Sequence, residues 1–203
     1  MNKPIAIIAG EPNSISSEII FKSWKLRKRY IHKPLMVIGN IQLLNLQKKK
    51  LKCNIQIKKI ENNFSIEDLN GSKLPVYNVE YNQKKPFQKI SNKSNKYIFR
   101  SFDIAINLIK NKKIIGLINC PVSKETLFEN KYQGITEFLS KKAGKENNEV
   151  MLIYNKKLSV SPLTTHIPLH QVCKKINKLR IVKKIKIINN FYKKIFNKNP
   201  NIA

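Results

Sequence analysis

Short apolar segments that alternate with amphipathic ones constrain the fold of this chain more than any other feature. The segments "PIAIIAG" at 4–10, "PLMVIGN" at 34–40 and "IIGLINCPV" at 114–122 are largely apolar, which predicts buried strands. Between them, residues 96–110 place apolar side chains at helical spacing on one face. Strands that alternate with helices predict an α/β protein with a mostly parallel sheet, here in three α/β/α layers.

The same patterns predict the remaining elements and a division into two domains. We expect further strands at 54–60, 73–80, 149–155 and 158–166, and helices over 15–24, 41–51, 123–130, 136–144, 168–176 and 179–196. Ser14 or Ser16 is expected to cap the first helix. We expect an N-terminal α/β domain over 1–120 and the first part of a second domain over 121–203, which would contribute to metal binding, substrate binding and dimerisation.

Composition limits the function classes. Apolar residues make up 41% of the 203 residues, which is typical of a packed protein and excludes global disorder. No apolar run approaches the roughly 20 residues that span a bilayer. The three cysteines are far apart and form no CxxC pair, so we expect reduced thiols, a cytoplasmic location and no zinc ribbon.

The net charge of +28 leaves two interpretations open. A nucleic-acid-binding protein is one, because basic surfaces bind phosphate backbones. Compositional drift toward Lys, Ile and Asn is the other, and it is favoured. The lysines are spread over almost every segment, and only four of the 40 basic residues are Arg, the residue that binds phosphates and bases with two donors.

Three residues at expected turns and helix starts are candidate site residues with a structural alternative each. Lys124 either attracts an anionic group or is simply solvated. Thr136 either caps the helix that it starts or donates to a ligand, and capping is favoured. His166 is either a buried histidine satisfied by hydrogen bonds or a ligand. A catalytic zinc needs about three protein ligands, and the nearby His170 is separated from His166 by Pro168.

Four motifs, taken in order, resemble one family. They are "GEPNSISSE" at 10–18, "INCPVSK" at 118–124, "GITEFL" at 134–139 and "VSPLTTHIPL" at 160–169. Together they resemble the 4-hydroxythreonine-4-phosphate dehydrogenase family (PdxA), which shows G-E-P-x-G-I-G-P-E, T-G-P-x-x-K, G-H-T-E-F and T-T-H-x-P-L in this order. The resemblance runs from Gly10 to about Ala203.

The resemblance implies a fold like that of isocitrate and isopropylmalate dehydrogenases, and a homodimer with the active site across its interface. It implies NAD-dependent oxidation of the 3-hydroxyl of 4-phosphohydroxy-L-threonine, followed by loss of CO2, in vitamin B6 synthesis. A divalent metal (Zn, Mg or Co) held by three histidines would polarise the hydroxyl. His166 matches the first of these ligands, Thr136 a substrate-binding residue and Lys124 the junction lysine, a catalytic residue.

The resemblance covers only the front part of the family's sequence. The other two metal-binding histidines and most of the phosphate and NAD residues come later in the family, so we expect the chain to be a C-terminally truncated fragment.

The resemblance also leaves the substrate open, because Ile135 replaces the family's His beside Thr136 at the substrate. Relatives that oxidise phosphorylated four-carbon sugar acids are the alternative. Asn119 and Cys120 replace the Thr-Gly of the junction.

The dispersed charge generates a first prediction. The chain should bind duplex DNA weakly and with no sequence preference, and each phosphate contact should contribute a slope of about 0.9 in log K against log salt. Fluorescence anisotropy with several unrelated duplexes over a salt series measures this. A tight complex with one sequence at physiological salt would contradict it.

Overall fold

A five-stranded, all-parallel sheet forms the centre of the first of two compact units, Met1–Asn130 and Lys131–Ala203. The computed structural model describes residues 3–30, 33–129, 131–132, 134–146 and 148–203. The strand order is β3-β4-β2-β1-β5. The strands are β1 (Ile5–Ile8), β2 (Leu35–Gly39), β3 (Ile57–Ile60), β4 (Leu74–Asn78) and β5 (Gly116–Asn119). The expected α/β class with a parallel sheet is confirmed.

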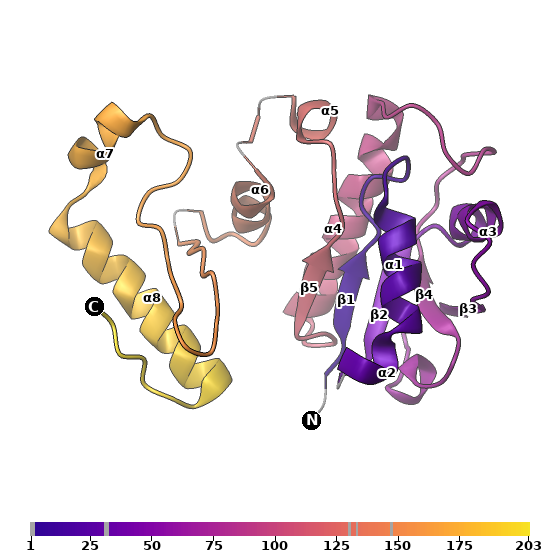
Figure 1. Cartoon of the computed structure of the whole chain (residues 1–203), viewed down its shortest axis with the longest axis horizontal. Helices are drawn as coiled ribbons and strands as arrows, with labels where there is room; N and C mark the ends of the chain where they lie inside the picture. Colours follow the sequence, from indigo (N-terminus) through magenta and orange to yellow (C-terminus); the bar gives the residue numbers. More distant parts are fainter. Residues whose placement is uncertain (1–2, 31–32, 130, 133, 147) are drawn as a thin grey trace. The chain divides into compact units, whose positions relative to one another are not determined.

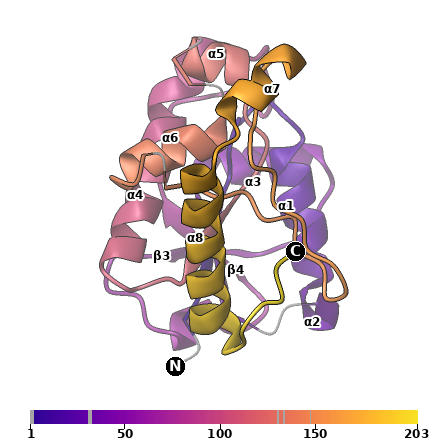
Figure 2. The ribbon, with the colours of Figure 1, turned by 90° about the vertical axis from the view of Figure 1, so that its left-hand side faces the viewer.

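Helices cover both faces of this sheet, as expected for three layers (Figure 1, Figure 2). One face carries α1 (Ser16–Lys25) and α3 (Ile41–Lys50), and the other carries α4 (Asn95–Lys110), which packs on β1 and β2. The shorter helices of this unit are α2 (Arg27–Tyr30), η1 (Glu67–Leu69), η2 (Asn92–Ser94) and α5 (Lys124–Phe128). Residue 130, the end of the helix expected over 123–130, lies outside the described residues.

The core of the first unit follows from the alternation of side chains along the strands. On the face of α1 and α3, Val37 and Val76 are buried in one cluster with Phe21 and Trp24. On α4, the helical spacing noted in the sequence places Phe102 among the fully buried side chains. Because both faces are covered, the central strands are apolar throughout rather than alternating.

The strand expected to be buried at 114–122 is instead an edge strand. Among the described residues of the first unit, β5 pairs only with β1. Ile115 and Ile118 are therefore 48% and 51% exposed. The sequence pattern predicted the strand correctly, but its burial depends on neighbours that this unit does not provide.

The second unit is mainly helical. It contains α6 (Ile135–Lys142), α7 (Leu169–Lys175) and α8 (Lys178–Phe196), close to the expected bounds. The two strands expected over 149–155 and 158–166 were wrong as extended strands, because the described residues form only one antiparallel bridge, between Ile153 and Val160. Neither α7 nor α8 has a buried residue. The predicted functional domain boundary at residue 120 stays a prediction.

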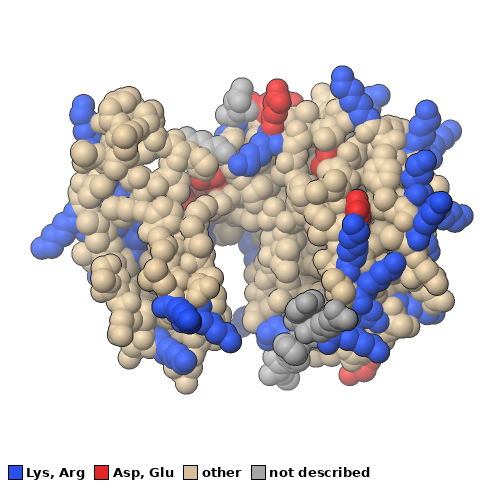
Figure 3. Space-filling view, in the orientation of Figure 1, with Lys and Arg blue, Asp and Glu red and all other residues tan. Residues whose placement is uncertain are grey.

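Two surface properties bear on function. Lys and Arg side chains are spread over the visible faces of both units rather than gathered on one (Figure 3). In the part of the chain that the structure describes, no helix combines the length and the apolar character needed to cross a bilayer.

Candidate active site

The carboxyl ends of β1 and β5 mark the most favourable place for a site in the first unit. The chain leaves β1 toward β2 on one side, whereas β5 lies on the other side. In open parallel sheets such a reversal of strand order leaves a crevice where ligands bind. The two loops at this point are residues 9–15 after β1 and residues 120–123 after β5, which carry two of the four sequence motifs.

Gly10 allows these two loops to lie against each other. Its φ is +69°, a left-handed conformation that favours glycine. A Cβ atom there would lie 2.5 Å from the carbonyl oxygen of Pro121. The next residue, Glu11, donates its backbone N–H to the same oxygen at 2.9 Å. The position therefore requires glycine for both its backbone conformation and its packing.

The carboxylate of Glu11 anchors the first loop from inside. The residue is 1% exposed. One carboxylate oxygen accepts a hydrogen bond from the hydroxyl of Ser94 at 2.8 Å, and the other accepts the backbone N–H of Asn13 at 3.1 Å. A buried carboxylate is stable only when its oxygens are hydrogen-bonded in this way. Glu11 therefore joins the loop to η2, at the start of α4.

Two glutamines that the sequence reasoning missed hold the same loop. Gln47 of α3 donates to the carbonyl oxygens of Pro12 at 2.7 Å and Pro86 at 3.0 Å. Gln83 donates to the side-chain oxygen of Asn13 at 2.9 Å. A signal for Gln47 exists in the sequence, because it follows two leucines at helical spacing and so falls on the apolar face of its helix.

The loop after β1 is unsuited to hold the pyrophosphate of a dinucleotide. Such a cradle needs free backbone N–H groups, whereas those of Glu11, Asn13, Ser14 and Ser16 are all bonded within the first unit. The N-cap position of α1 is held by Ile15, which offers no side-chain cap, but the hydroxyl of Ser14 accepts the backbone N–H of Ser16, the first residue of the helix, at 3.2 Å. At Glu11, Asn13, Ser14 and Ser16 the loop therefore offers no free backbone donors for the phosphates of NAD.

Lys124 lies at the start of α5, on the loop that follows β5. Its side chain is exposed. Ser123 caps the helix by accepting the backbone N–H of Thr126 at 3.4 Å. Asn95, the first residue of α4, donates to the carbonyl oxygen of Thr126 at 2.7 Å. The backbone that carries Lys124 is thus fixed to the first unit, while its ammonium group remains accessible to an anion.

Ile135 and Thr136 are the first two residues of α6 in the second unit, and both are half-buried. The expectation that Thr136 caps this helix was wrong. The N-cap is Gly134, and no side chain caps the helix. Thr136 lies inside the first turn because the helix starts one residue earlier than the sequence predicted. Its hydroxyl is therefore not needed as a cap.

His166 has an unusual backbone conformation. Among the described residues, five non-glycine residues have positive φ, and four of them lie directly beyond a helix end, where a left-handed residue is common. His166, with φ +56°, lies in a bend before α7 instead. Its side chain is exposed, so the interpretation as a buried core histidine was wrong. Left-handed backbone outside helix ends is often found at functional sites.

The metal predicted from the resemblance fits this chain in ligand type but not in ligand number. An exposed imidazole such as that of His166 is a suitable ligand. Within the described ranges, however, no group of three or more His, Cys, Asp or Glu side chains could hold an ion. The described residues therefore do not form a metal site by themselves.

Burial suppresses the ionisation of two groups near the strand ends. Burial raises the pKa of the Cys120 thiol to about 11. It also raises the pKa of Tyr97 well above its usual range, against the opposing effect of the hydrogen bond from the backbone N–H of Asn40. Both groups are therefore neutral at physiological pH, and Cys120 is not a nucleophile.

Comparison with known proteins identifies the family. A sequence model described as "Pyridoxal phosphate biosynthetic protein PdxA" matches residues 31–203. The chain belongs to the PdxA family. A 4-hydroxythreonine-4-phosphate dehydrogenase of Sulfurihydrogenibium sp. is 33% identical over 98% of this chain and 61% of its own length. The chain thus spans about three fifths of that relative.

Two further members show the range of the family. A putative D-threonate 4-phosphate dehydrogenase of Oceanobacillus iheyensis is 28% identical over 99% of this chain and 61% of its own length. Among solved structures, a putative 4-hydroxythreonine-4-phosphate dehydrogenase from Salmonella typhimurium matches with a TM-score of 0.82 and 26% identity, covering 95% of this chain and 60% of that chain. The predicted PdxA fold is thereby confirmed for the region that this chain spans.

The close approach at Gly10 predicts a large loss of stability on substitution. Gly10→Ala should lower the free energy of unfolding by about 1–2 kcal/mol for the left-handed backbone and by a further ~1–3 kcal/mol for the clash with Pro121. Gly71→Ala is the control, because Gly71 also has positive φ but open space around it. Urea unfolding followed by the fluorescence of Trp24, the only tryptophan, reports on this unit. Equal losses would show that the loops do not need this contact.

The raised pKa of Cys120 predicts slow alkylation. At pH 8 only about one thiol in a thousand is ionised when the pKa is 11, so iodoacetamide should label Cys120 at least ~100-fold more slowly than the exposed Cys173. The Cys120 rate should rise with pH up to about 11. Mass spectrometry of native and urea-unfolded protein measures both rates. Rapid native labelling of Cys120 would contradict its burial.

Proposed function

We propose that this chain supplies part of an NAD-dependent 4-hydroxythreonine-4-phosphate dehydrogenase. The reaction is oxidation of the 3-hydroxyl of 4-phosphohydroxy-L-threonine, and the 3-oxo acid then loses CO2 to give an aminoketone phosphate for vitamin B6 synthesis. The match to the family model over residues 31–203 is the observation that carries this proposal. We further propose a cytoplasmic homodimer with the site at the subunit interface, as the family resemblance implies.

Three side chains are proposed to belong to the active site, two that bind the substrate and one that binds a metal. The exposed ammonium group of Lys124 attracts a phosphate or carboxylate of the substrate, and the capped start of α5 fixes the backbone that carries it. The hydroxyl of Thr136, which no cap uses, donates a hydrogen bond to the substrate. His166 contributes one ligand to the metal, and its left-handed backbone supports a role in binding over a role in packing.

A related substrate is the second candidate. The family's His beside Thr136 is Ile135 here, which removes a polar contact to the substrate. The Oceanobacillus iheyensis relative, described as acting on D-threonate 4-phosphate, is also similar over almost the whole chain. Both substrates are phosphorylated four-carbon hydroxy acids, so Lys124 would serve either one. The nucleic-acid alternative has less support, because the basic side chains form no single visible face (Figure 3).

His166→Ala tests the proposed role in a complete enzyme. The protein tested joins this chain to the part of the Sulfurihydrogenibium sp. relative that lies outside the matched region. NADH formation from 4-phosphohydroxy-L-threonine should fall more than ~100-fold in kcat/KM, since loss of a direct ligand exceeds the 10–100-fold typical of its supporting contacts. Zinc affinity, measured by calorimetry, should fall as well, while NAD affinity stays within about threefold.

His170→Ala is the matched control, because His170 is also an exposed imidazole only four residues away. It should leave turnover and zinc affinity within about twofold. Faster turnover of D-threonate 4-phosphate than of the hydroxythreonine phosphate would select the second candidate. If the unsubstituted protein reduces NAD with neither substrate, the proposed function is wrong.

A further inference from the structure

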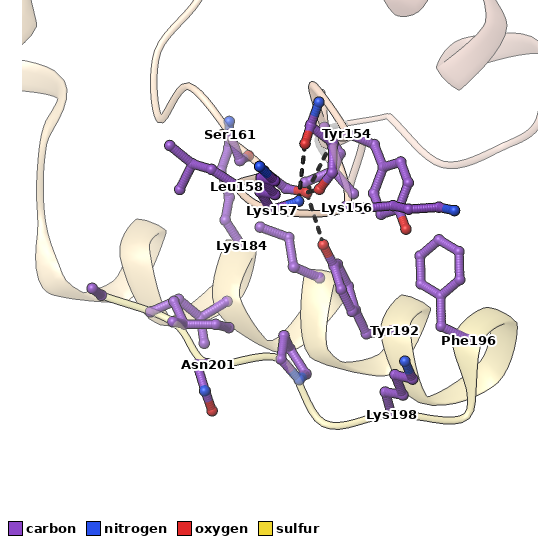
Figure 4. A pocket seen from close by; sticks show the side chains of 18 of the residues that line it. Tyr154, Lys156, Lys157, Leu158, Ser161, Lys184, Tyr192, Phe196, Lys198 and Asn201 are labelled. Atoms are coloured by element: carbon purple, nitrogen blue, oxygen red, sulfur yellow. Dashed lines mark hydrogen bonds between the residues drawn. The ribbon is translucent and has the colours of Figure 1, made fainter.

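The two units contain cavities of very different character. In the second unit, a groove of about 840 Å³ lies beside α8, and its walls include exposed side chains such as that of Leu158 (Figure 4). In the first unit, a cavity of about 10 Å³ is lined by the loop after β1 and by α1, α3 and α4, and every residue that lines it is buried. The smaller cavity is therefore closed off from solvent, and its polar lining determines what it can hold.

Ser17 brings an unpaired hydroxyl to this cavity. It is the second residue of α1 and is 4% exposed. Among the residues that the structure describes, its Oγ has no hydrogen-bond partner. A buried hydroxyl without a partner is destabilising, because it has lost its hydrogen bonds to water. The family's opening motif has Pro at this position, so the requirement for a partner comes with the serine of this chain.

Tyr97 of α4 brings a second unused donor. Its side chain is buried, and its hydroxyl oxygen accepts the backbone N–H of Asn40 at 3.2 Å. Within the described ranges, no atom accepts the proton of this hydroxyl. Burial raises the pKa of Tyr97 well above its usual range, so the proton stays on the oxygen at physiological pH. Tyr97 thus offers a permanent O–H donor on the wall of the cavity.

The carboxylate of Glu11 supplies the matching acceptor on the same cavity. Its oxygens accept one hydrogen bond each, from Ser94 and from the backbone of Asn13. A carboxylate has about four acceptor positions, so both oxygens can accept again. Burial is the largest cause of the raised pKa of Tyr97, and the charge of Glu11 adds to it, which indicates that the two groups lie close together.

We propose that this cavity is a binding site for one water molecule, which accepts the hydroxyl protons of Ser17 and Tyr97 and donates to the carboxylate of Glu11. A volume on the order of 10–15 Å³ is enough for a water, and buried waters typically make about three hydrogen bonds. This water joins α1 and α4 to the loop after β1. It thereby adds to the direct contacts that hold the loop at the crevice.

A sodium ion is the other occupant of this size, and the lining suits it less well. A cation is held by several oxygen lone pairs, whereas the lone pair of Tyr97 that accepts from Asn40 is already in use. Leu43 and Leu44 also line the cavity and offer no side-chain oxygen. Two O–H donors and one carboxylate match a neutral group that both accepts and donates.

Ser17→Ala tests the proposal through the sign of its effect on stability. Urea unfolding of the 203-residue chain, followed by the fluorescence of Trp24, gives the unfolding equilibrium constant. If a water bonds the hydroxyl, its removal loses a hydrogen bond, and the constant should rise about 3–10-fold. If the hydroxyl has no partner, its removal relieves an unsatisfied group, and the constant should fall.

Ser23→Ala is the matched control, because Ser23 is an exposed serine of the same helix. It measures the change in helix propensity alone and should leave the constant unchanged or slightly lower. The unfolding constant of the unsubstituted chain should be the same in sodium chloride and in choline chloride at equal ionic strength. A crystal structure of the chain should show one water roughly 2.5–3.2 Å from the oxygens of Ser17, Tyr97 and Glu11.

The proposal is overturned if Ser17→Ala destabilises the chain no more than Ser23→Ala, or if the crystal structure shows no water in contact with these three residues. Stabilisation by sodium that Ser17→Ala abolishes would assign the cavity to a cation and would overturn it as well. No readout depends on NAD turnover, so failure of the proposed function leaves this result interpretable.

Discussion

The contact between Gly10 and the carbonyl of Pro121 is the constraint on which the first unit's site depends. It brings the ends of β1 and β5 together at the point where the strand order reverses. A side chain at residue 10 would push the two loops apart, because a carbonyl oxygen of the backbone cannot move aside cheaply. The second loop leads directly into α5, whose first residue is Lys124.

The loop after β1 shows how a buried charge can serve structure instead of chemistry. The carboxylate of Glu11 is satisfied by Ser94 and by the backbone of its own loop, while Gln47 and Gln83 hold the loop from two other segments. Because the backbone N–H groups of this loop are already hydrogen-bonded, the loop shapes the crevice, and a ligand there would be bound by exposed groups instead. The resemblance to the family's opening motif therefore reflects packing at least as much as binding.

The two units differ in how well the sequence pattern predicted them. In the first unit, α4 was predicted within one residue at its start, because its apolar face packs against strands of the same unit. In the second, the strands expected around Ile153 and Val160 reduce to one bridge. A strand needs neighbours to complete its hydrogen bonds. The edge strand β5 shows the same limit, since its apolar pattern was read correctly but its burial was not.

The sequence by itself determined the α/β class, the positions of the longer helices and the family, since apolar periodicity and motif order are local properties of the chain. It also selected Lys124, Thr136 and His166 as candidates. Only the tertiary structure decided that Thr136 is no cap and that His166 is exposed on a left-handed backbone. It alone revealed the polar support of the Gly10 loop. Such facts depend on contacts between residues far apart in sequence, and no local pattern encodes the distances between them.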